Sequence, residues 1–310
     1  MDWQNKNVVV TGGSGFLGSR VVDVLQKRGA KNIVIPRSSD CDLRIQSNCE
    51  KITRNADIVF HLAAKVGGIG LNREFPGQLF YDNLIMGVNL MEEARKNKVE
   101  KFISLGTICS YPKFTPLPFS EDSIWDGYPE ETNAPYGLAK KMLLVQSQAY
   151  KQEYGFKSIT VFPTNLYGPN DSFDDKKSHV IPALIKKIYQ AKKNKSDFID
   201  LWGDGTPTRD FLYVDDAAEG IVLAAEKYDK SDPVNLGTGK EISIKELAEL
   251  LLRLMHAQLK INWQKEKPSG QPRRCVDPTR AFREFGFKPK ISLEEGLQRT
   301  IEWYEQTQKN

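Results

Sequence analysis

The sequence predicts an α/β protein with a doubly wound parallel sheet, followed by a smaller, interleaved α+β domain. Over the first half of the 310 residues, short apolar runs rich in β-branched residues alternate with helical patterns. A glycine-rich segment follows the first of these runs. Strands that alternate with helices are typical of a parallel sheet covered by helices on both faces. A chain of this length that is 40% hydrophobic also has enough apolar residues for a large core.

Five strands and three helices are expected in the first part of the chain. Gly29 marks the end of the first helix, because glycine is common just past a helix terminus. The strands are expected at residues 7–11, 32–35, 57–63, 101–106 and 158–162. The helices are expected at residues 15–29, 76–97 and 134–154.

The pattern changes after residue 168, where prolines, glycines and charged residues become dense up to about residue 211. Beyond this segment we expect a helix at 213–228, a short strand at 233–239, and helices at 243–256 and 292–307. We therefore predict a nucleotide-binding domain over residues 1–167 with return segments near 212–238, and a mainly substrate-binding domain over residues 168–310.

The charge distribution argues against a nucleic-acid-binding protein. The net charge is +4, and the basic runs at 192–197 and 271–275 are typical of solvated surface. These runs lack the interleaved aromatic residues that nucleic-acid-binding segments carry. A mildly basic pocket for an anionic small molecule is equally consistent with the charge, so we expect no nucleic-acid partner.

The cysteines and the N-terminus predict the compartment. Cys41, Cys49, Cys109 and Cys275 are scattered and include no pair with zinc-ligand spacing, so we expect neither disulfides nor a metal site. The N-terminus enters a strand without a signal-peptide pattern, and no run of about 18 apolar residues is present. We therefore expect a cytoplasmic protein without a membrane partner.

The segment TGGSGFLG at residues 11–18 lies between the first strand and the first helix. Gly12 or Gly13, together with Gly15 and Gly18, fits the glycine spacing of dinucleotide-binding loops. Such glycines permit a tight turn and let a pyrophosphate approach the free N–H groups of a helix N-terminus. In this position the motif predicts a Rossmann-type domain with a nicotinamide dinucleotide as its cofactor.

Arg37 predicts which dinucleotide is bound. An acidic residue about twenty positions beyond the glycine loop would bind the ribose of NAD. Here the second strand is followed by Arg37, Ser38 and Ser39, and a guanidinium suits a 2′-phosphate. The sequence thus favours NADP(H), with a solvent-facing arginine as the alternative.

Tyr136 and Lys140 predict reductase chemistry. They are four residues apart on a predicted helix and therefore share one face. An ammonium near a tyrosine favours the phenolate, so that the hydroxyl exchanges a proton with a carbonyl oxygen more readily. Thr107, at the end of the fourth strand, supplies a second hydroxyl for the same oxygen. Cys109 follows it, and a free cysteine is by itself most often a small buried apolar residue.

Several longer stretches carry a family resemblance over most of the chain. They are HLAAKVGG (61–68), SLGTICSYPK (104–113), NAPYGLAK (133–140), PTNLYGPND (163–171), SHVIPALI (178–185) and WGDGTPTRDFLYVDD (202–216). With them the chain resembles the extended short-chain dehydrogenases/reductases, and within these it is similar to the GDP-L-fucose synthase family. It departs from the family's usual pattern at Thr107, where serine is common, and at Ile108, which replaces a small polar residue.

The resemblance implies NADPH-dependent 3,5-epimerisation and 4-reduction of GDP-4-dehydro-6-deoxy-D-mannose to GDP-L-fucose. It assigns Cys109 and His179 as the base and the acid that invert C3 and C5, and Tyr136 as the proton donor to the C4 oxygen. It also implies a homodimer that associates through a four-helix interface. Thr107 keeps the hydroxyl of the usual serine, so we expect an active enzyme with an altered rate.

The binding residues complete the prediction. The expected NADP(H) contacts are Gly12, Gly13, Ser14, Gly15, Phe16, Leu17, Gly18, Arg37, Leu62, Ala63, Ala64, Leu105, Gly106, Lys140, Pro163, Thr164, Asn165, Leu166 and His179. The resemblance implies contacts to the GDP-sugar substrate from Lys187, Trp202, Arg209 and Asp277. For Lys187, an ordinary surface charge is nearly as good an explanation as a substrate contact. For Trp202, the alternative explanation is a core residue.

Two alternatives remain open at this point. A related reductase or epimerase could act on another GDP- or UDP-deoxyhexose, because pocket shape decides the product. A catalytically silent NADP-binding regulatory protein would share the fold. The presence of Thr107, Cys109, Tyr136, Lys140 and His179 together disfavours the silent protein.

Overall fold

The computed structural model describes residues 1–175, 178–267 and 271–309. Its centre is a six-stranded sheet in the order β10-β5-β4-β3-β1-β2, in which every pair of neighbours is parallel. The strands are β1 (Asn7–Thr11), β2 (Asn32–Val34), β3 (Ile58–His61), β4 (Lys101–Leu105), β5 (Ser158–Pro163) and β10 (Val234–Leu236). The chain reverses its direction of winding between β1 and β3. Ligands of open α/β sheets bind outside the carboxyl ends of the strands at such a reversal.

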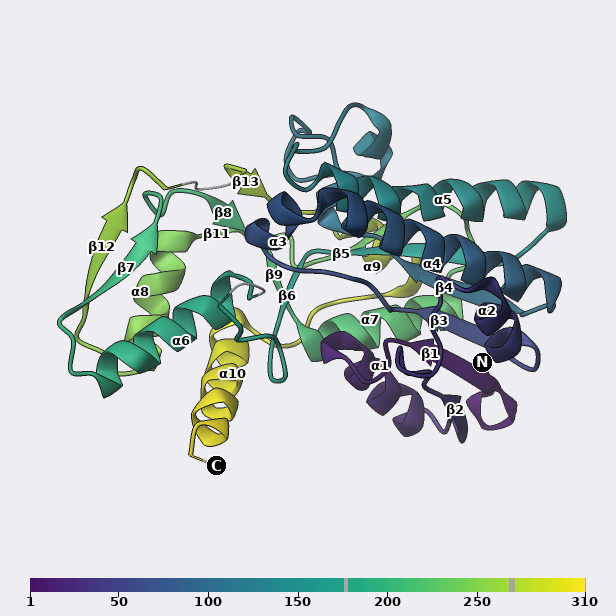
Figure 1. Cartoon of the computed structure of the whole chain (residues 1–310), viewed down its shortest axis with the longest axis horizontal. Coiled ribbons are helices and arrows are strands. Elements are labelled where there is room, and N and C mark those ends of the chain that lie inside the picture. The colour runs from purple at the N-terminus through teal and green to yellow at the C-terminus, as the bar shows by residue number, and fades with distance from the viewer. Residues whose placement is uncertain (176–177, 268–270, 310) are drawn as a thin grey trace.

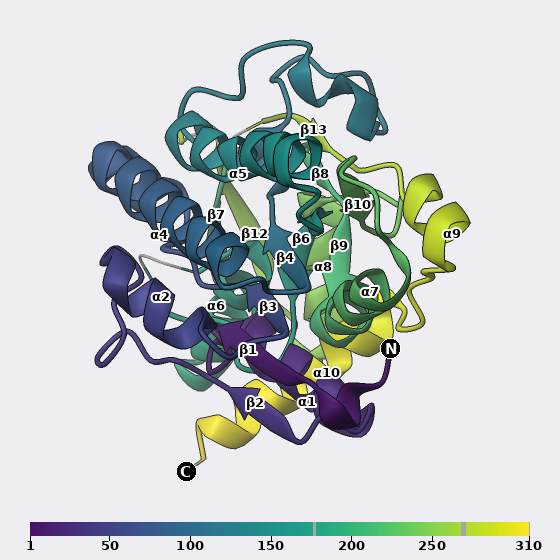
Figure 2. The same ribbon diagram turned by 90° about the vertical axis from the view of Figure 1, so that its right-hand side faces the viewer.

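Helices cover both faces of this sheet, as Figure 2 shows. On one side α1 (Phe16–Lys27) packs on α7 (Val214–Lys227), which also contacts the short α9 (Thr279–Phe285). On the other side α4 (Pro76–Lys96) lies between α2 (Gln46–Thr53) and α5 (Ala134–Tyr154). Every residue of β3, β4 and β5 is buried, as expected for central strands of a parallel sheet.

The remaining elements form a second assembly, on the left in Figure 1. Its helices are α6 (Val180–Lys193), α8 (Ile244–Leu254) and α10 (Leu293–Thr307). Its short strands pair as β7 (Phe198–Trp202) with β12 (Lys260–Gln264), β6 (Asn165–Tyr167) with β9 (Phe211–Tyr213), and β8 (Thr208–Arg209) with β11 (Ile242–Ser243) and β13 (Arg273–Arg274). The short helices η1 (Trp3–Asn5), α3 (Ile69–Glu74), η2 (Ile108–Ser110) and η3 (Glu121–Trp125) complete the described elements.

The fold class predicted from the sequence is confirmed. The predicted helix at 134–154 has those bounds in the structure, and it ends at Gly155 with φ +65°. The predicted strand at 7–11 also has those bounds, and the other predicted elements are present with ends that shift by at most three residues. None of the described helices is long and apolar enough to cross a membrane.

The chain forms two main hydrophobic cores, and each combines residues from distant parts of the sequence. The first core lies under the parallel sheet and includes Ala281 and Phe285 from α9, which return to it from late in the chain. The second core joins Tyr167, Leu184 and Leu247 to the C-terminal α10. The domain boundary at 167/168 stays a prediction.

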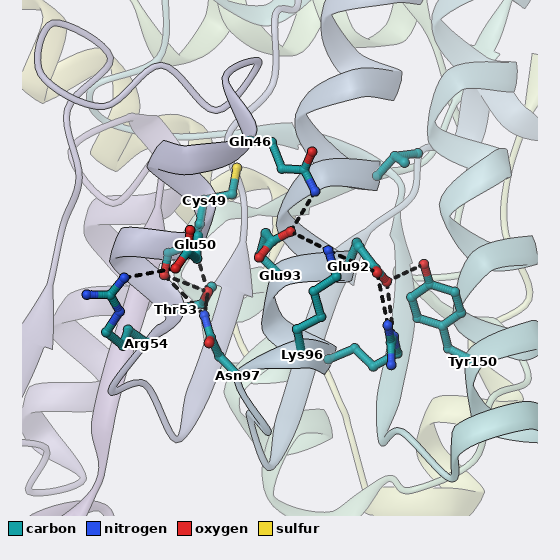
Figure 3. A network of polar contacts seen from close by, with 12 residues as sticks. Gln46, Cys49, Glu50, Thr53, Arg54, Glu92, Glu93, Lys96, Asn97 and Tyr150 are labelled. Carbon is teal, nitrogen blue, oxygen red and sulfur yellow. Dashed lines mark hydrogen bonds and ion pairs between the residues drawn. The ribbon is translucent and has the colours of Figure 1, made fainter.

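A network of polar contacts fixes α2 against α4 and α5 (Figure 3). Gln46 Nε2 donates to Glu93 Oε1 at 2.6 Å, and Asn97 Nδ2 donates to Thr53 Oγ1 at 2.8 Å. Tyr150 of α5 donates its hydroxyl to Glu92 at 2.7 Å. Hydrogen bonds from Arg95 lower the pKa of Glu92 to about 2. These contacts hold together the helices that follow β2 and β3, whose connecting loops reach the carboxyl edge of the sheet.

Candidate active site

A cavity of about 1200 Å³ opens at the carboxyl edge of the parallel sheet. It is lined by residues that follow β1, β2, β3, β4 and β5, and by residues of the second assembly. Most of the predicted site residues line it: Gly12, Ser14, Gly15, Phe16, Leu17, Gly18, Arg37, Leu62, Ala63, Ala64, Leu105, Gly106, Cys109, Tyr136, Lys140, Pro163, Thr164, Asn165, Leu166, His179 and Arg209. The volume exceeds that of an ordinary drug-sized pocket and has room for two ligands.

The glycine loop is shaped by close approaches that exclude side chains. Gly12 has φ +71°, and a Cβ on it would lie 2.8 Å from the backbone nitrogen of Ala63. A Cβ on Gly18 would lie 2.0 Å from the carbonyl oxygen of Gly12. Gly15 precedes α1 without a side-chain cap, so the first N–H groups of the helix remain free to bind an anion.

Charged side chains surround the loop after β2. Arg37 is exposed, lines the cavity, and makes no ion pair within the described part of the chain. Arg44 and Lys65 also line the cavity, but both are ion-paired with Asp82, each at 3.1 Å. Arg37 is therefore the cation of this loop that is available to an incoming phosphate.

The loop after β4 brings Thr107, Cys109 and Tyr136 together. Thr107 caps η2, where its hydroxyl oxygen accepts the N–H of Cys109 at 3.3 Å. The next helix, α5, packs directly on this turn, since a Cβ on Gly137 would lie 2.3 Å from the carbonyl oxygen of Cys109. Ser110 Oγ donates to the carbonyl of Gly137 at 2.8 Å, which fixes the start of α5 and thus Tyr136.

Ile108, which departs from the usual pattern, points away from this site. It is 4% exposed and belongs to a small core with Phe119, Leu144 and Phe162. The substitution therefore changes packing behind the site rather than its polar groups. Thr107 itself hydrogen-bonds to Tyr136, as expected for two hydroxyls that are predicted to bind the same carbonyl oxygen of the substrate.

Burial controls the titration of Tyr136 and Lys140. It raises the pKa of Tyr136 well above its usual range, and the hydrogen bond from Thr107 offsets this only in part. Lys140 is 2% exposed, and burial lowers its pKa to about 8. Without cofactor, Lys140 therefore loses its charge before Tyr136 ionises. Burial of both groups opposes the stabilisation of the phenolate by the Lys140 ammonium that the sequence predicts, and that role of Lys140 stays a prediction.

Lys140 should make the stability of the protein depend on pH. Its pKa is about 8 in the folded protein and ordinarily 10.5, so between these values only the unfolded chain keeps the proton. The free energy of unfolding contributed by this residue therefore rises with pH across that window. Lys140→Met should be more stable than wild type below pH 8, and this advantage should shrink by about 3 kcal/mol towards pH 10.5. Urea unfolding of both proteins at several pH values checks this, and a constant difference would contradict it.

His61 lies beneath the same site at the end of β3. It is fully buried, and its Nδ1 lies 3.0 Å from Thr11 Oγ1, whereas its Nε2 has no hydrogen-bond partner. Burial lowers its pKa well below the usual range, and the charge of nearby Lys140 adds to this. The ring is therefore a neutral neighbour of Lys140.

Two arginines lie close to Cys109. Arg274 Nη1 is 3.5 Å from Cys109 Sγ, and Arg274 is 9% exposed. Burial and, to a smaller extent, the charge of Arg274 lower the pKa of Arg209 to about 10, and Cys109 opposes this shift. The half-buried cysteine thus faces positive charge.

His179 occupies the N-cap position of α6 and lines the cavity with its side chain exposed. Burial raises the pKa of the neighbouring Asp171, and the positive charge of His179 opposes that shift. Asp171 Oδ1 accepts the N–H of Ser172 at 2.7 Å, while its Oδ2 is buried without a hydrogen-bond partner.

Five predicted site residues do not line the cavity, and their roles, like those of the residues that do, stay predictions. Gly13 packs behind the loop, where a Cβ would lie 2.9 Å from Ile35 Cγ2. Thr107 contacts Tyr136 from the side. Lys187 donates to the carbonyl of Asp200 at 2.7 Å, Trp202 is 60% exposed at the end of β7, and Asp277 accepts the N–H of Thr279 at 2.9 Å.

Arg274 and Gln271 line the cavity but were not predicted as site residues. They belong to the run at 271–275, whose charge density predicted solvated surface. The alternation of an exposed Arg273 with a buried Arg274 is a strand-like pattern that two residues are too short to reveal.

Comparisons with known proteins agree with this geometry. Residues 8–237 match the NAD dependent epimerase/dehydratase family. Among curated relatives, the probable GDP-L-fucose synthase 1 of Oryza sativa subsp. japonica is 40% identical, covering 96% of this chain and 91% of its own. The GDP-L-fucose synthase of Escherichia coli K12 is 34% identical, with 98% of each chain covered. A solved GDP-L-fucose synthetase from Naegleria fowleri bound to NADP superposes with a TM-score of 0.88 at 28% identity, covering 99% of this chain and 96% of its own.

Proposed function

Because this chain belongs to the NAD dependent epimerase/dehydratase family and is similar to GDP-L-fucose synthases over nearly its whole length, we infer that it makes GDP-L-fucose. The reaction is the NADPH-dependent 3,5-epimerisation and 4-reduction of GDP-4-dehydro-6-deoxy-D-mannose. The observation that carries this conclusion is the meeting of two sets of groups in one cavity. Tyr136 and Lys140 provide reduction, and Cys109 and His179 provide inversion.

NADP(H) fits the residues that are present. A Cβ on Gly12 or Gly18 would clash with the backbone of Ala63 or of Gly12, so these glycines permit the tight loop that leaves the space beside it to a pyrophosphate. The free N–H groups of α1 face this space, and Arg37 offers an unpaired cation for a 2′-phosphate. When bound, NADPH supplies the hydride that reduces C4.

For the reduction, Tyr136 donates its hydroxyl proton to the C4 oxygen as that oxygen gains negative charge. The raised pKa keeps Tyr136 protonated at neutral pH and therefore able to donate. Thr107 hydrogen-bonds to Tyr136 and orients its hydroxyl. Lys140, four residues along α5, can return a proton to Tyr136, since its pKa of about 8 lies near neutrality.

For the inversions, Cys109 and His179 act on opposite faces of the sugar. The thiolate of Cys109 takes the proton of C3 or C5. The S–H bond forms as the C–H bond breaks, and the electron pair moves onto the C4 oxygen. His179 then gives a proton to the other face of the carbon. Before the second inversion, the thiol releases its proton to water and His179 takes one up. The hydroxyls of Thr107 and Tyr136 stabilise the enolate oxygen.

The substrate's nucleotide end lies towards the second assembly in this proposal. Arg209 is half-buried, and its one side-chain hydrogen bond within the described part of the chain goes to the backbone carbonyl of Thr208, so its charge is available to a diphosphate. Trp202 is exposed and offers a flat apolar face for the guanine. Lys187 and Asp277 remain proposed contacts. In the structure the side chain of each is hydrogen-bonded to a backbone group.

We also propose a cytoplasmic homodimer. All four cysteines are free, which suits a reducing compartment. Exposed apolar side chains lie on neighbouring α4 and α5, among them Phe80, Tyr81 and Val145. Two copies of this helix pair would form a four-helix interface that buries these side chains. Sedimentation equilibrium should give twice the monomer mass, and a monomer at micromolar concentration would contradict the proposal.

Identification of the product tests the proposed function. Purified protein is incubated with GDP-4-dehydro-6-deoxy-D-mannose and NADPH, and the sugar is identified by nuclear magnetic resonance. GDP-L-fucose is expected. A reduced sugar that keeps the original configuration at C3 or C5 would show a different reductase, and no NADPH oxidation would show a silent binding protein.

Arg37→Ala should raise the Michaelis constant for NADPH by roughly tenfold to a hundredfold, since a charge-assisted hydrogen bond is worth about 1.5–3 kcal/mol. The constant for NADH should stay unchanged, because NADH lacks the 2′-phosphate. Arg54→Ala is the matched control, as Arg54 is an exposed arginine paired with Glu50 on α2. Equal effects of Arg37→Ala on the two cofactors would show that Arg37 faces solvent.

Arg209→Ala should weaken GDP binding by roughly tenfold to a hundredfold in calorimetry, for the same energetic reason. Arg273→Ala serves as the control, because Arg273 lies on the adjacent strand but is exposed and ion-paired with Glu241. Unchanged affinity in Arg209→Ala would mean that the diphosphate binds elsewhere.

A further inference from the structure

Arg274 is placed against Cys109 by a short piece of sheet. β13 runs parallel to β8, and Arg274 is in register with Arg209. Neighbours in register on parallel strands send their side chains to the same face. Arg273, one residue earlier, takes the opposite face, where it is exposed and ion-paired with Glu241. The strand alternation thus directs Arg274, and not Arg273, towards the cavity.

No carboxylate neutralises Arg274 within the part of the chain that the structure describes. Its Nε donates to the amide oxygen of Gln271 at 2.8 Å, and its Nη1 donates to Cys109 Sγ at 3.5 Å. Gln271 is held in turn by a hydrogen bond from its Nε2 to the carbonyl of Lys113 at 3.2 Å. The buried guanidinium therefore contacts a neutral amide on one side and a thiol on the other. Of these two partners only the thiol can become an anion and so balance the charge of Arg274.

We propose that Arg274 stabilises the thiolate form of Cys109, so that the residue is ready to take a proton from the sugar carbon. The inference rests on the proposed function, in which Cys109 is the base. Arg274 acts through Cys109 and is therefore a positioning residue. Among the described residues, Tyr136 from α5 and Arg209 from β8 also interact electrostatically with Cys109.

Tyr136 and Arg209 do not provide the same stabilisation. Burial keeps Tyr136 in its neutral form, and a negative charge on Cys109 raises its pKa further. Arg209 is the in-register neighbour of Arg274 on β8, but its one side-chain hydrogen bond among the described residues goes to the carbonyl of Thr208 and not to the sulfur. Arginine keeps its charge at every pH at which the enzyme works, so Arg274 favours the thiolate both before and after each proton transfer.

The test is the pH dependence of alkylation of Cys109 by iodoacetamide in the cofactor-free protein. The modified peptide is followed by mass spectrometry, which separates Cys109 from Cys41, Cys49 and Cys275. In Arg274→Gln the midpoint of the rate against pH should rise by about one unit or more relative to wild type, the usual effect of removing an adjacent opposite charge. At pH 7 this means alkylation about tenfold slower.

Two further variants make the result specific. Arg274→Lys keeps a charge but not the planar fork, so its midpoint should lie between those of wild type and Arg274→Gln. Arg273→Gln should leave the midpoint unchanged, since Arg273 faces away. Thermal unfolding shows that each variant is folded, and if Arg274→Gln fails to fold, Arg274→Lys supplies the comparison. A midpoint that stays the same in the folded Arg274 variants would overturn the proposal.

A second measurement separates this inference from the function on which it rests. Calorimetry with GDP should give similar affinities for wild type and Arg274→Gln. A large loss of GDP affinity with an unchanged alkylation midpoint would make Arg274 a diphosphate ligand and overturn the proposal. The alkylation assay needs no substrate, so a wild-type protein that made no GDP-L-fucose would contradict the proposed function while the Arg274–Cys109 result still stood.

Discussion

Tyr136→Phe is expected to abolish NADPH oxidation while it leaves proton exchange at C3 and C5 measurable. Phenylalanine keeps the ring but removes the hydroxyl to which Thr107 hydrogen-bonds, and with it the proton that Tyr136 is proposed to donate to the C4 oxygen. Loss of a positioned general acid lowers a rate by about 10²–10⁴-fold. Exchange needs only Cys109 and a polarised ketone, which Thr107 continues to bind. The measurements are NADPH absorbance and mass spectrometry of the sugar recovered from deuterated water.

The matched control for this variant is Tyr150→Phe. Tyr150 lies on the same helix and also loses a hydroxyl hydrogen bond, in its case to Glu92 at 2.7 Å. It is remote from the cavity, so NADPH oxidation should remain close to that of wild type. If Tyr136→Phe oxidised NADPH within tenfold of wild type, Tyr136 would not be the proton donor.

Cys109→Ser is expected to have the opposite effect on the two halves of the reaction, because it removes the proposed base for proton exchange and leaves Tyr136 in place. Exchange at C3 and C5 should fall by at least a hundredfold, because a serine hydroxyl is a far poorer base than a thiol near neutral pH. GDP-L-fucose should no longer form, although NADPH still binds, since the glycine loop and Arg37 are untouched. Exchange is measured by mass spectrometry, and NADPH binding by fluorescence titration.

Cys41→Ser provides the comparison for the thiol itself. Cys41 is also half-buried, but it lies on the turn after β2, where its N–H bonds to the carbonyl of Arg37 at 2.8 Å. Its replacement should not change exchange at the sugar carbons. Full exchange in Cys109→Ser would return Cys109 to the role of a small buried side chain, and the base would have to be another residue.

The sequence predicted the parts of the site that depend on local spacing. The glycine loop, the four-residue interval between Tyr136 and Lys140, and the helix that carries them follow from neighbours along the chain. The pairing of Cys109 with His179 came from the family resemblance alone, because no spacing connects residues seventy positions apart.

Other parts depend on long-range structure and could not be predicted. Arg274 reaches Cys109 only because β13 pairs with β8, and two-residue strands carry no readable pattern. The lowered pKa of Lys140 depends on its burial in the folded protein. Helix α6 was not predicted, because prolines, glycines and charged residues are dense between residues 168 and 211; its own Pro182 lies in the first turn, where proline is tolerated.

The central claim is that one cavity carries out both inversion and reduction, and one reaction in deuterated water tests it most directly. Wild-type protein is given GDP-4-dehydro-6-deoxy-D-mannose and unlabelled NADPH, and the isotope at each carbon of the product is read by nuclear magnetic resonance. The account predicts GDP-L-fucose with deuterium at C3 and C5 and protium at C4. A reduced sugar with protium at C3 and C5 would contradict it, because the hydride would then have been delivered without any proton exchange at the carbons that Cys109 and His179 are proposed to invert.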